Sequence, residues 1–145
     1  MVFPAHLGWR GWCWPVLLAG MIVYASGSGN VAGPAMIGFD KVAHFFVFGL
    51  LATLVVRNGF ALRRAWLAVV LVSLFGATDE LHQSFTPGRT MQAADWVADT
   101  LGAIVAVAVY TRWPAYRRWL EAPLRRLGKS RIEKSAQLSP NTDLA

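Results

Sequence analysis

The chain has 145 residues; 55% are hydrophobic and only 15% are charged, whereas an average soluble domain carries about 25% charged residues. This length allows one domain, and the depletion of charge argues against an ordinary soluble one. The formal net charge of +6 does not indicate nucleic-acid binding, because residues 112–145 hold eight Lys/Arg against three Asp/Glu and the rest is almost neutral. A basic tail beside apolar segments is instead typical of a cytoplasmic anchor facing anionic lipid.

Four apolar segments follow one another along the chain, at about 12–25, 42–56, 66–78 and 96–110. With flanking residues, each reaches the roughly 17–21 residues that a helix rising ~1.5 Å per residue needs to cross a ~30 Å hydrocarbon layer. The runs do not alternate, which disfavours strands, and they leave no polar helical face for water, which disfavours a soluble four-helix core. We therefore predict an all-α integral membrane bundle of four transmembrane helices over 1–111 and a basic, partly disordered cytoplasmic tail over 112–145.

The first segment has a second interpretation. Arg10, a short apolar run and the small residues Ala25 and Gly27 also match a cleaved signal peptide. The orientation of the other three segments is the same under both interpretations.

Basic residues decide the orientation. The loop between the second and third segments carries Arg57, Arg63 and Arg64, and the tail carries eight more Lys/Arg, whereas the loops on the other side carry only Lys41 and Arg89. The positive-inside rule therefore predicts that both termini and the first of these loops are cytoplasmic.

Polar side chains gather at the expected outer face, where three of the segments begin or end. Every acidic residue before position 120 belongs to this set, which comprises Asp40, Lys41, His44, Asp79, Glu80, Gln83, Arg89, Asp95 and Asp99. The set includes three i, i+4 pairs, each on one side of its helix: Asp40/His44, Asp79/Gln83 and Asp95/Asp99. Because such groups cost several kcal/mol each against lipid, we expect them to point into the bundle and toward one another. A stripe of small residues on the fourth segment, which would let a neighbouring helix approach closely, is formed by Ala94, Ala98, Gly102 and Ala106.

These residue types suit a divalent cation and a phosphate. The candidate metal ligands, of hard oxygen type, are Asp79, Glu80, Asp95 and Asp99. Lys41 and Arg89 could hold an anion. The set fits metal-assisted phosphoryl transfer or hydrolysis of a lipid-linked or other envelope precursor at the outer leaflet. In this hypothesis the catalytic residues are Asp40, His44, Asp79, Glu80, Arg89 and Asp95, and the ligand-binding residues are Lys41, Gln83 and Asp99.

Two further hypotheses remain open. The cluster fits a purely structural role, in which polar groups pair and set helix register; the expected pairs are Arg89 with Asp79 or Asp95, and Asp40 with Lys41 or His44. The chain also fits a non-catalytic accessory protein that binds an envelope precursor, a lipid or a partner. A transporter is disfavoured, because the inner halves of the segments are apolar apart from Thr53 and Ser73.

Three motifs on successive segments resemble the VanZ-like membrane protein family: "DKVAH" (40–44), "DELHQSFTPGR" (79–89) and "DWVADTLG" (95–102). The resemblance covers about 39–110 and gives no support to the first forty residues or the tail. It implies a small four-span protein of the bacterial inner membrane. The family is named after an accessory protein of glycopeptide resistance that raises tolerance to teicoplanin, and the resemblance implies no settled biochemical activity.

The family's polar signature falls on Asp40, Lys41, His44, Asp79, Glu80, Gln83, Arg89 and Asp95. One departure is Asp99, where the pattern commonly has Asn. An extra carboxylate at this position could add a metal ligand, or it could be protonated in an apolar setting.

Overall fold

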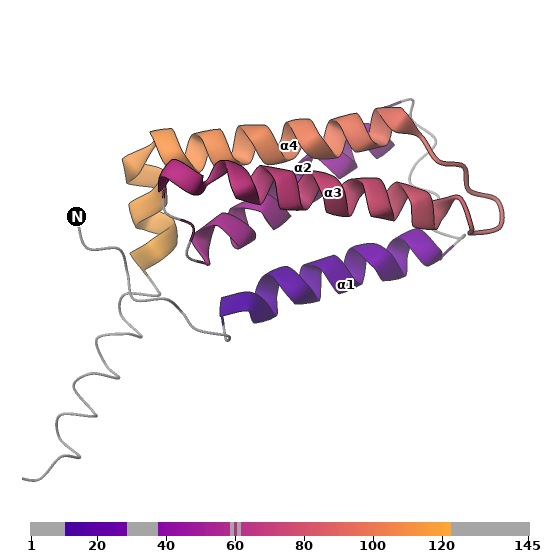
Figure 1. Cartoon of the computed structure of the whole chain (residues 1–145), viewed down its shortest axis with the longest axis horizontal. Helices are drawn as coiled ribbons and strands as arrows, with labels where there is room; N and C mark the ends of the chain where they lie inside the picture. Colours follow the sequence, from indigo (N-terminus) through magenta and orange to yellow (C-terminus); the bar gives the residue numbers. More distant parts are fainter. Residues whose placement is uncertain (1–10, 29–37, 59, 61, 123–145) are drawn as a thin grey trace, which may run out of the picture.

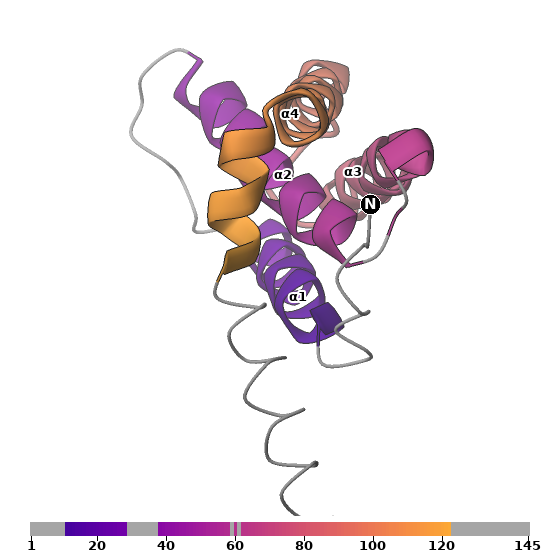
Figure 2. The same cartoon turned by 90° about the vertical axis from the view of Figure 1, so that its left-hand side faces the viewer.

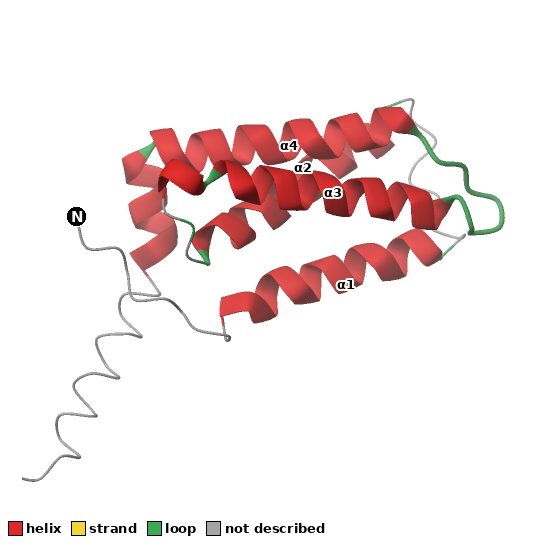
Figure 3. Cartoon of the chain, viewed as in Figure 1, coloured by secondary structure: helices red, strands yellow, loops and turns green. Residues whose placement is uncertain are grey.

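The computed structural model describes residues 11–28, 38–58, 60 and 62–122, and every regular element within this part of the chain is helical (Figure 3). The four α-helices are α1 (Cys13–Gly27), α2 (Phe39–Arg57), α3 (Trp66–Gln83) and α4 (Ala93–Arg112) (Figure 1). A 3₁₀ helix (Leu62–Arg64) precedes α3, and a helical segment at 114–122 follows α4. The prediction of an all-α fold is confirmed. The tail from residue 123 onward lies outside the described residues.

Three of these elements are long and apolar enough to cross a membrane: Phe39–Arg57, Leu62–Gln83 and Ala93–Arg112. The fourth, α1, has 15 residues; at ~1.5 Å per residue it spans about 22 Å, short of a ~30 Å hydrocarbon layer. It stops at Gly27 because Ser28 already has an extended backbone, with φ −94° and ψ 101°. The predicted four transmembrane helices are therefore found as three candidate spans and one shorter apolar helix.

The helices run past the apolar segments and include the polar residues at their ends. α2 begins at Phe39, α3 continues to Gln83 and α4 begins at Ala93. Backbone N–H and C=O groups in hydrocarbon have no water to bond, so a helix must satisfy them internally until it leaves the lipid. Apart from Arg89 and Gln92, which lie between α3 and α4, the polar side chains are therefore held on helices.

The closest packing in the bundle is between α2 and α4, whose arrangement is seen from the end in Figure 2. A Cβ atom at Gly102 would clash with the carbonyl oxygen of Phe45, and one at Gly49 would lie 3.1 Å from the carbonyl oxygen of Gly102. The small-residue stripe on α4 therefore does allow a close approach at Gly102, as expected.

The outer surface of the bundle is apolar. Large exposed side chains occur on every helix, among them Trp14, Tyr24, Phe46, Leu74 and Ile104. A water-soluble monomer rarely exposes contiguous apolar surface on this scale. Together with the three long apolar helices, this surface fits a multi-pass membrane protein.

Basic residues lie at the opposite end of the bundle from the polar set. Here Arg57, at the end of α2, donates a hydrogen bond to the carbonyl oxygen of Leu120 at 2.9 Å. The Tyr110 hydroxyl donates to Glu121 Oε1 at 2.8 Å. These bonds hold the 114–122 segment against the ends of α2 and α4, as Figure 2 shows.

Candidate functional site

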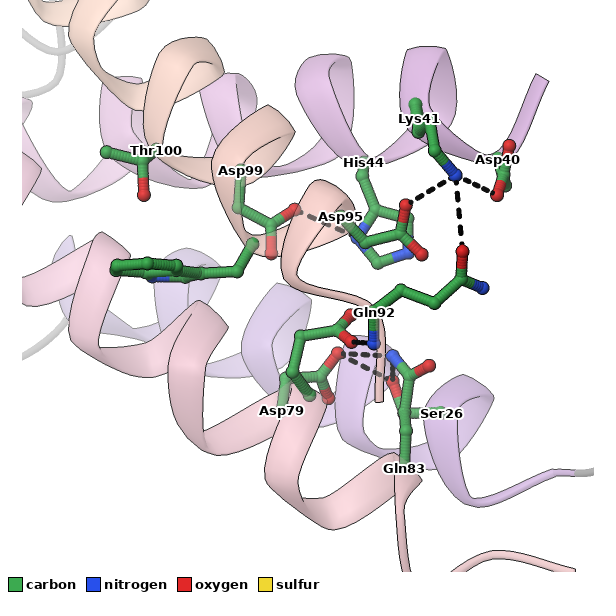
Figure 4. A network of polar contacts seen from close by, with 12 residues as sticks. Ser26, Asp40, Lys41, His44, Asp79, Gln83, Gln92, Asp95, Asp99 and Thr100 are labelled. Carbon is green, nitrogen blue, oxygen red and sulfur yellow. Dashed lines mark hydrogen bonds and ion pairs between the residues drawn. The ribbon is translucent and has the colours of Figure 1, made fainter. Parts of the chain in front are cut away.

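The predicted site residues meet at one end of the bundle, where α1 and α3 end and α2 and α4 begin (Figure 1). Figure 4 shows side chains from all four helices in this region. They form three groups, which share helices but differ in burial and in hydrogen bonding. The expected convergence of polar side chains from three segments is therefore present, and α1 adds a fourth.

The first group, which we call the inner group, comprises His44, Glu80 and Asp99. His44 Nδ1 lies 2.9 Å from Asp99 Oδ1 and joins α2 to α4. Glu80 on α3 and Asp99 are both 0% exposed. One ligand atom from each of the three residues lies within 4.8 Å of the others. Two carboxyl groups and an imidazole are thus packed together inside the bundle.

A glycine makes room for the inner group. A Cβ atom at Gly76 of α3 would lie 2.8 Å from Asp99 Oδ2 and 3.3 Å from the ring of Phe48. The missing side chain therefore lets the Asp99 carboxyl group lie against α3, one helical turn from Glu80. Phe48 also stacks on the His44 ring, with the centroids 5.9 Å apart and an angle of 10° between the planes. The Phe48 ring and the hydrogen bond to Asp99 together orient the imidazole between α2 and α4.

Glu80 also positions the start of α4. Its Oε2 atom accepts a hydrogen bond of 2.8 Å from the backbone N–H of Gln92, the residue before α4. The first N–H groups of a helix lack intrahelical partners, and a carboxylate near them is favoured by the helix dipole. One side chain of α3 therefore holds the amino-terminal end of the next helix.

The second group, the rim group, is centred on Lys41. The ammonium Nζ lies 2.7 Å from Asp40 Oδ2, 3.0 Å from Asp95 Oδ1 and 3.4 Å from the amide oxygen of Gln92. The Asp95 side chain is 5% exposed, while those of Lys41 and Asp40 are 38% and 46% exposed. Lys41 therefore bridges a buried carboxylate of α4 and an exposed one on its own helix.

The third group, the Asp79 group, joins α1 to α3. Asp79 Oδ2 accepts hydrogen bonds from the Ser26 hydroxyl at 2.8 Å and from Gln83 Nε2 at 3.1 Å. Gln83 Oε1 in turn accepts from Arg89 Nη2 at 2.8 Å. The i, i+4 pairing expected for Asp79 and Gln83 is present as a direct hydrogen bond.

Some expected pairs differ. Among the described residues, Arg89 donates to the Gln83 amide and not to Asp79 or Asp95. His44 pairs with Asp99 and not with Asp40. The expected bond between Asp40 and Lys41 is present. An i, i+4 spacing shows which residues share a helix face, but the rotation of that face against its neighbour decides which residues pair.

The set of close ligand atoms also differs from the expected metal ligands. Of the four carboxylates expected, Glu80 and Asp99 belong to the inner group, and His44 takes the third position. Asp79 is held by Ser26 and Gln83, and Asp95 by Lys41. Within the described residues, neither of them belongs to a group of three or more ligands of this kind.

Three residues that take part in these contacts escaped the sequence analysis: Ser26, Gly76 and Gln92. Ser26 lies in "YASGSG", which has the composition of a turn or a cleavage site. Gly76 acts by leaving space free, and Gln92 acts through its backbone N–H. Neither feature gives a pattern in the sequence.

Two apolar grooves flank the bundle. One, of about 240 Å³, is lined by residues of α1, α2 and α3, and the other, of about 300 Å³, by residues of α2 and α4 together with Tyr116. Neither is lined by an ionisable residue of the three groups. The polar side chains are therefore enclosed largely by one another, and the open polar pocket expected from the sequence is not one of these two grooves.

The inner group has two chemical capacities. An imidazole oriented by a carboxylate is an arrangement that can accept and return a proton. An imidazole nitrogen with two carboxylate oxygens is also a ligand set for a divalent metal ion. The charge at this end of the bundle favours a cation, because five carboxyl groups face only two permanent cations, Lys41 and Arg89.

Comparison with known proteins identifies the family. The sequence model of the VanZ/LLP1 family matches residues 6–114. This match includes α1 and extends well beyond the stretch at about 39–110 that carries the motifs. Neither the curated proteins nor the solved structures contain a match to the chain. Since the family match covers most of the sequence and all three groups of polar residues, the chain belongs to the VanZ/LLP1 family.

Proposed function

We propose that this VanZ-like chain is a four-span protein of the bacterial inner membrane whose polar end faces outward. Arg57, Arg63 and Arg64 lie at the end opposite the inner group, and cytoplasmic loops are enriched in such residues. Both termini are then cytoplasmic. The α1 helix acts as the fourth span, supported by its inclusion in the family match and by the hydrogen bond from Ser26 to Asp79.

At the outward end, the protein acts as a metal-assisted hydrolase or transferase on a lipid-linked or phosphorylated envelope precursor. The observation that carries this proposal is that the buried Glu80 and Asp99 lie beside the partly buried His44, each on a different helix. Placing ionisable groups inside a membrane bundle is costly, and such groups commonly mark functional sites. Two such residues would be enough for a structural pair between helices. The inner group holds three, two of which carry carboxyl groups.

Each group has a role in this proposal. The bonded pair His44 and Asp99 and the neighbouring Glu80 carboxyl group form the reactive centre. Lys41 and Arg89, at the edges of the cluster, attract and orient an anionic phosphate. Asp40 and Asp95 position Lys41, and Asp79 and Gln83 position Arg89. A divalent cation bound beside these residues would supply positive charge that offsets the excess of carboxylates and would polarise a phosphoryl oxygen.

The test is phosphate release by the purified protein in detergent or lipid nanodiscs. The panel consists of polyprenyl phosphates and diphosphates and of phospholipids, each with and without Mn²⁺, Zn²⁺ or Mg²⁺. We expect release that depends on the cation and that falls about 100-fold or more in Glu80→Gln and in Arg89→Ala. Arg64→Ala, an exposed cation at the opposite end, is the matched control and should keep the wild-type rate. Absence of product over the whole panel, or unchanged turnover in Arg89→Ala, would refute the proposal.

A second candidate function is non-catalytic binding of an envelope precursor, lipid or partner, as in an accessory protein of glycopeptide resistance. The observation in its favour is that Lys41, Arg89 and Gln83 are already bonded to neighbouring protein groups. A photo-reactive polyprenyl phosphate should then crosslink near Lys41 while no turnover is measured. Crosslinking that is equal in Lys41→Met and in the wild type would count against this function.

A further inference from the structure

We propose that His44, Glu80 and Asp99 form a binding site for one divalent transition-metal ion, of the Zn²⁺ or Mn²⁺ type, inside the outward end of the bundle. This inference deepens the proposed function and rests on it for the role of the metal, but binding is measured separately from turnover. It assigns a ligand set that differs from the four carboxylates favoured by sequence spacing.

The positions of the ligand atoms support this site. The three residues come from α2, α3 and α4, and one ligand atom from each lies within 4.8 Å of the others. Ligand atoms bound at about 2.0–2.2 Å to one tetrahedral ion lie ~3.3–3.6 Å apart. The widest separation in the inner group must therefore close by about 1 Å or slightly more, which rotation of the three side chains would supply.

Two buried carboxylate oxygens of the inner group lack a hydrogen-bond partner among the described residues. Glu80 Oε1 and Asp99 Oδ2 are buried and accept no hydrogen bond from any residue in the described part of the chain. Both side chains are 0% exposed. A buried carboxylate oxygen without a donor carries a desolvation cost. A bound cation would satisfy both oxygens at once.

The charge of the inner group also favours a cation. Within the described residues, neither Glu80 nor Asp99 forms an ion pair with a lysine or arginine. Lys41 is bonded to Asp40 and Asp95, and Arg89 is bonded to Gln83. The inner group therefore keeps two carboxyl groups against one imidazole, and a divalent ion restores the balance.

The ligand atoms indicate the kind of metal. Imidazole nitrogen suits Zn²⁺ and related transition-metal ions and the two carboxylates also suit Mn²⁺, whereas Ca²⁺ and Mg²⁺ prefer sites made only of oxygen. Three protein ligands leave at least one position open, which is the pattern of catalytic and not structural zinc sites.

Two further residues position the carboxyl groups of Glu80 and Asp99. The N–H of Gln92 holds Glu80 through Oε2 and leaves Oε1 free, and Gly76 admits the Asp99 carboxyl group. Such supporting contacts orient metal ligands.

The experiment measures Zn²⁺ binding to the purified full chain, carrying a tag without histidine and stripped with EDTA. Stoichiometry is read by elemental analysis after dialysis, affinity by competition with a chromophoric chelator, and the ligand environment by the visible spectrum of Co²⁺. We expect one Zn²⁺ per chain and a Co²⁺ spectrum of low coordination number. Affinity should fall by at least about tenfold in each of the near-isosteric variants Glu80→Gln and Asp99→Asn.

The matched controls keep their metal. Asp79→Asn removes the carboxylate next to Glu80 on the same helix, and Asp40→Asn removes an exposed one on the helix of His44; both should bind Zn²⁺ as the wild type does. His44→Gln is a third test variant, should either carboxylate variant fail to elute as a single species. Wild-type stoichiometry below that of Asp99→Asn, unchanged affinity in Glu80→Gln, or Mg²⁺ binding as tightly as Zn²⁺ would each overturn the assignment.

The two proposals fail in different ways. Zn²⁺ binding without turnover supports the metal site and refutes the enzymatic function. Turnover by a chain that binds no metal refutes the site.

Discussion

The contact between Gly102 and Phe45 sets the spacing of α2 and α4, and with it the distance between His44 and Asp99. Gly102 follows Asp99 by three residues, and Phe45 is the residue after His44. Because a Cβ atom at Gly102 would clash with the Phe45 carbonyl oxygen, Gly102→Ala must push two helix backbones apart. Adding volume to a packed core costs about 1–3 kcal/mol. A backbone obstacle cannot rotate away, so the cost lies near the upper limit.

Alanine also favours the helix over glycine by about 1 kcal/mol, which leaves a net destabilisation of about 2 kcal/mol. Gly20→Ala in α1 is the matched control, because a Cβ atom there meets nothing within 4 Å and only the helical gain remains. The assay is reversible unfolding in mixed micelles, with the free energy extrapolated to the native detergent. Gly102→Ala should be less stable than the wild type and Gly20→Ala equal to it or more stable. If both variants are stabilised alike, the close approach of α2 and α4 does not exist.

Two further predictions concern the Asp79 group and the rim group. Ser26→Ala removes the hydroxyl that bonds Asp79 at 2.8 Å and should cost about 1 kcal/mol, with faster amide exchange in α1. In the control Ser28→Ala, the lost hydroxyl donates to the carbonyl oxygen of Tyr24 in α1 and, among the described residues, reaches no other helix. Amide exchange of α1 that is faster in Ser28→Ala than in Ser26→Ala would contradict the predicted link between α1 and α3. Lys41→Met leaves Asp95 buried without its cation and should destabilise the fold, by less than the loss of one partner from a fully buried pair because Lys41 is partly exposed. The double variant with Asp95→Asn should recover most of this loss, measured by thermal unfolding; losses that simply add would show that the two residues do not interact.

The architecture of the helices followed from the sequence because hydrocarbon imposes a simple rule. A continuous apolar run must be helical to satisfy its backbone, and the positions of Asp40, Asp79 and Asp95 marked where such runs meet the membrane face. The length of α1 was harder to predict. Its end depends on the backbone at Ser28, and a serine followed by glycines fits a helix end, a loop or a cleavage site equally well.

The pairing of the polar residues could not be predicted from spacing. Asp79 and Gln83 lie on one helix, so their separation of four residues was sufficient to predict that they share a helix face, on which the structure shows a hydrogen bond between them. His44 and Asp99 lie on different helices, and their contact depends on how far α2 and α4 approach and rotate. That approach is set by Gly102 and that rotation in part by Gly76, where what matters is an absent side chain.

The account depends most directly on the contact between His44 and Asp99. It can be measured in proteoliposomes by solid-state NMR, as dipolar dephasing between a ¹⁵N-labelled imidazole and ¹³C-labelled aspartate carboxyl groups. The substitutions His6→Gln and His82→Gln leave His44 as the single histidine. Because Nδ1 lies 2.9 Å from Oδ1, the nitrogen should be within about 4 Å of a carboxyl carbon, and Asp99→Asn should remove that signal. Absence of dephasing in the otherwise intact protein would mean that these helix ends do not share a site.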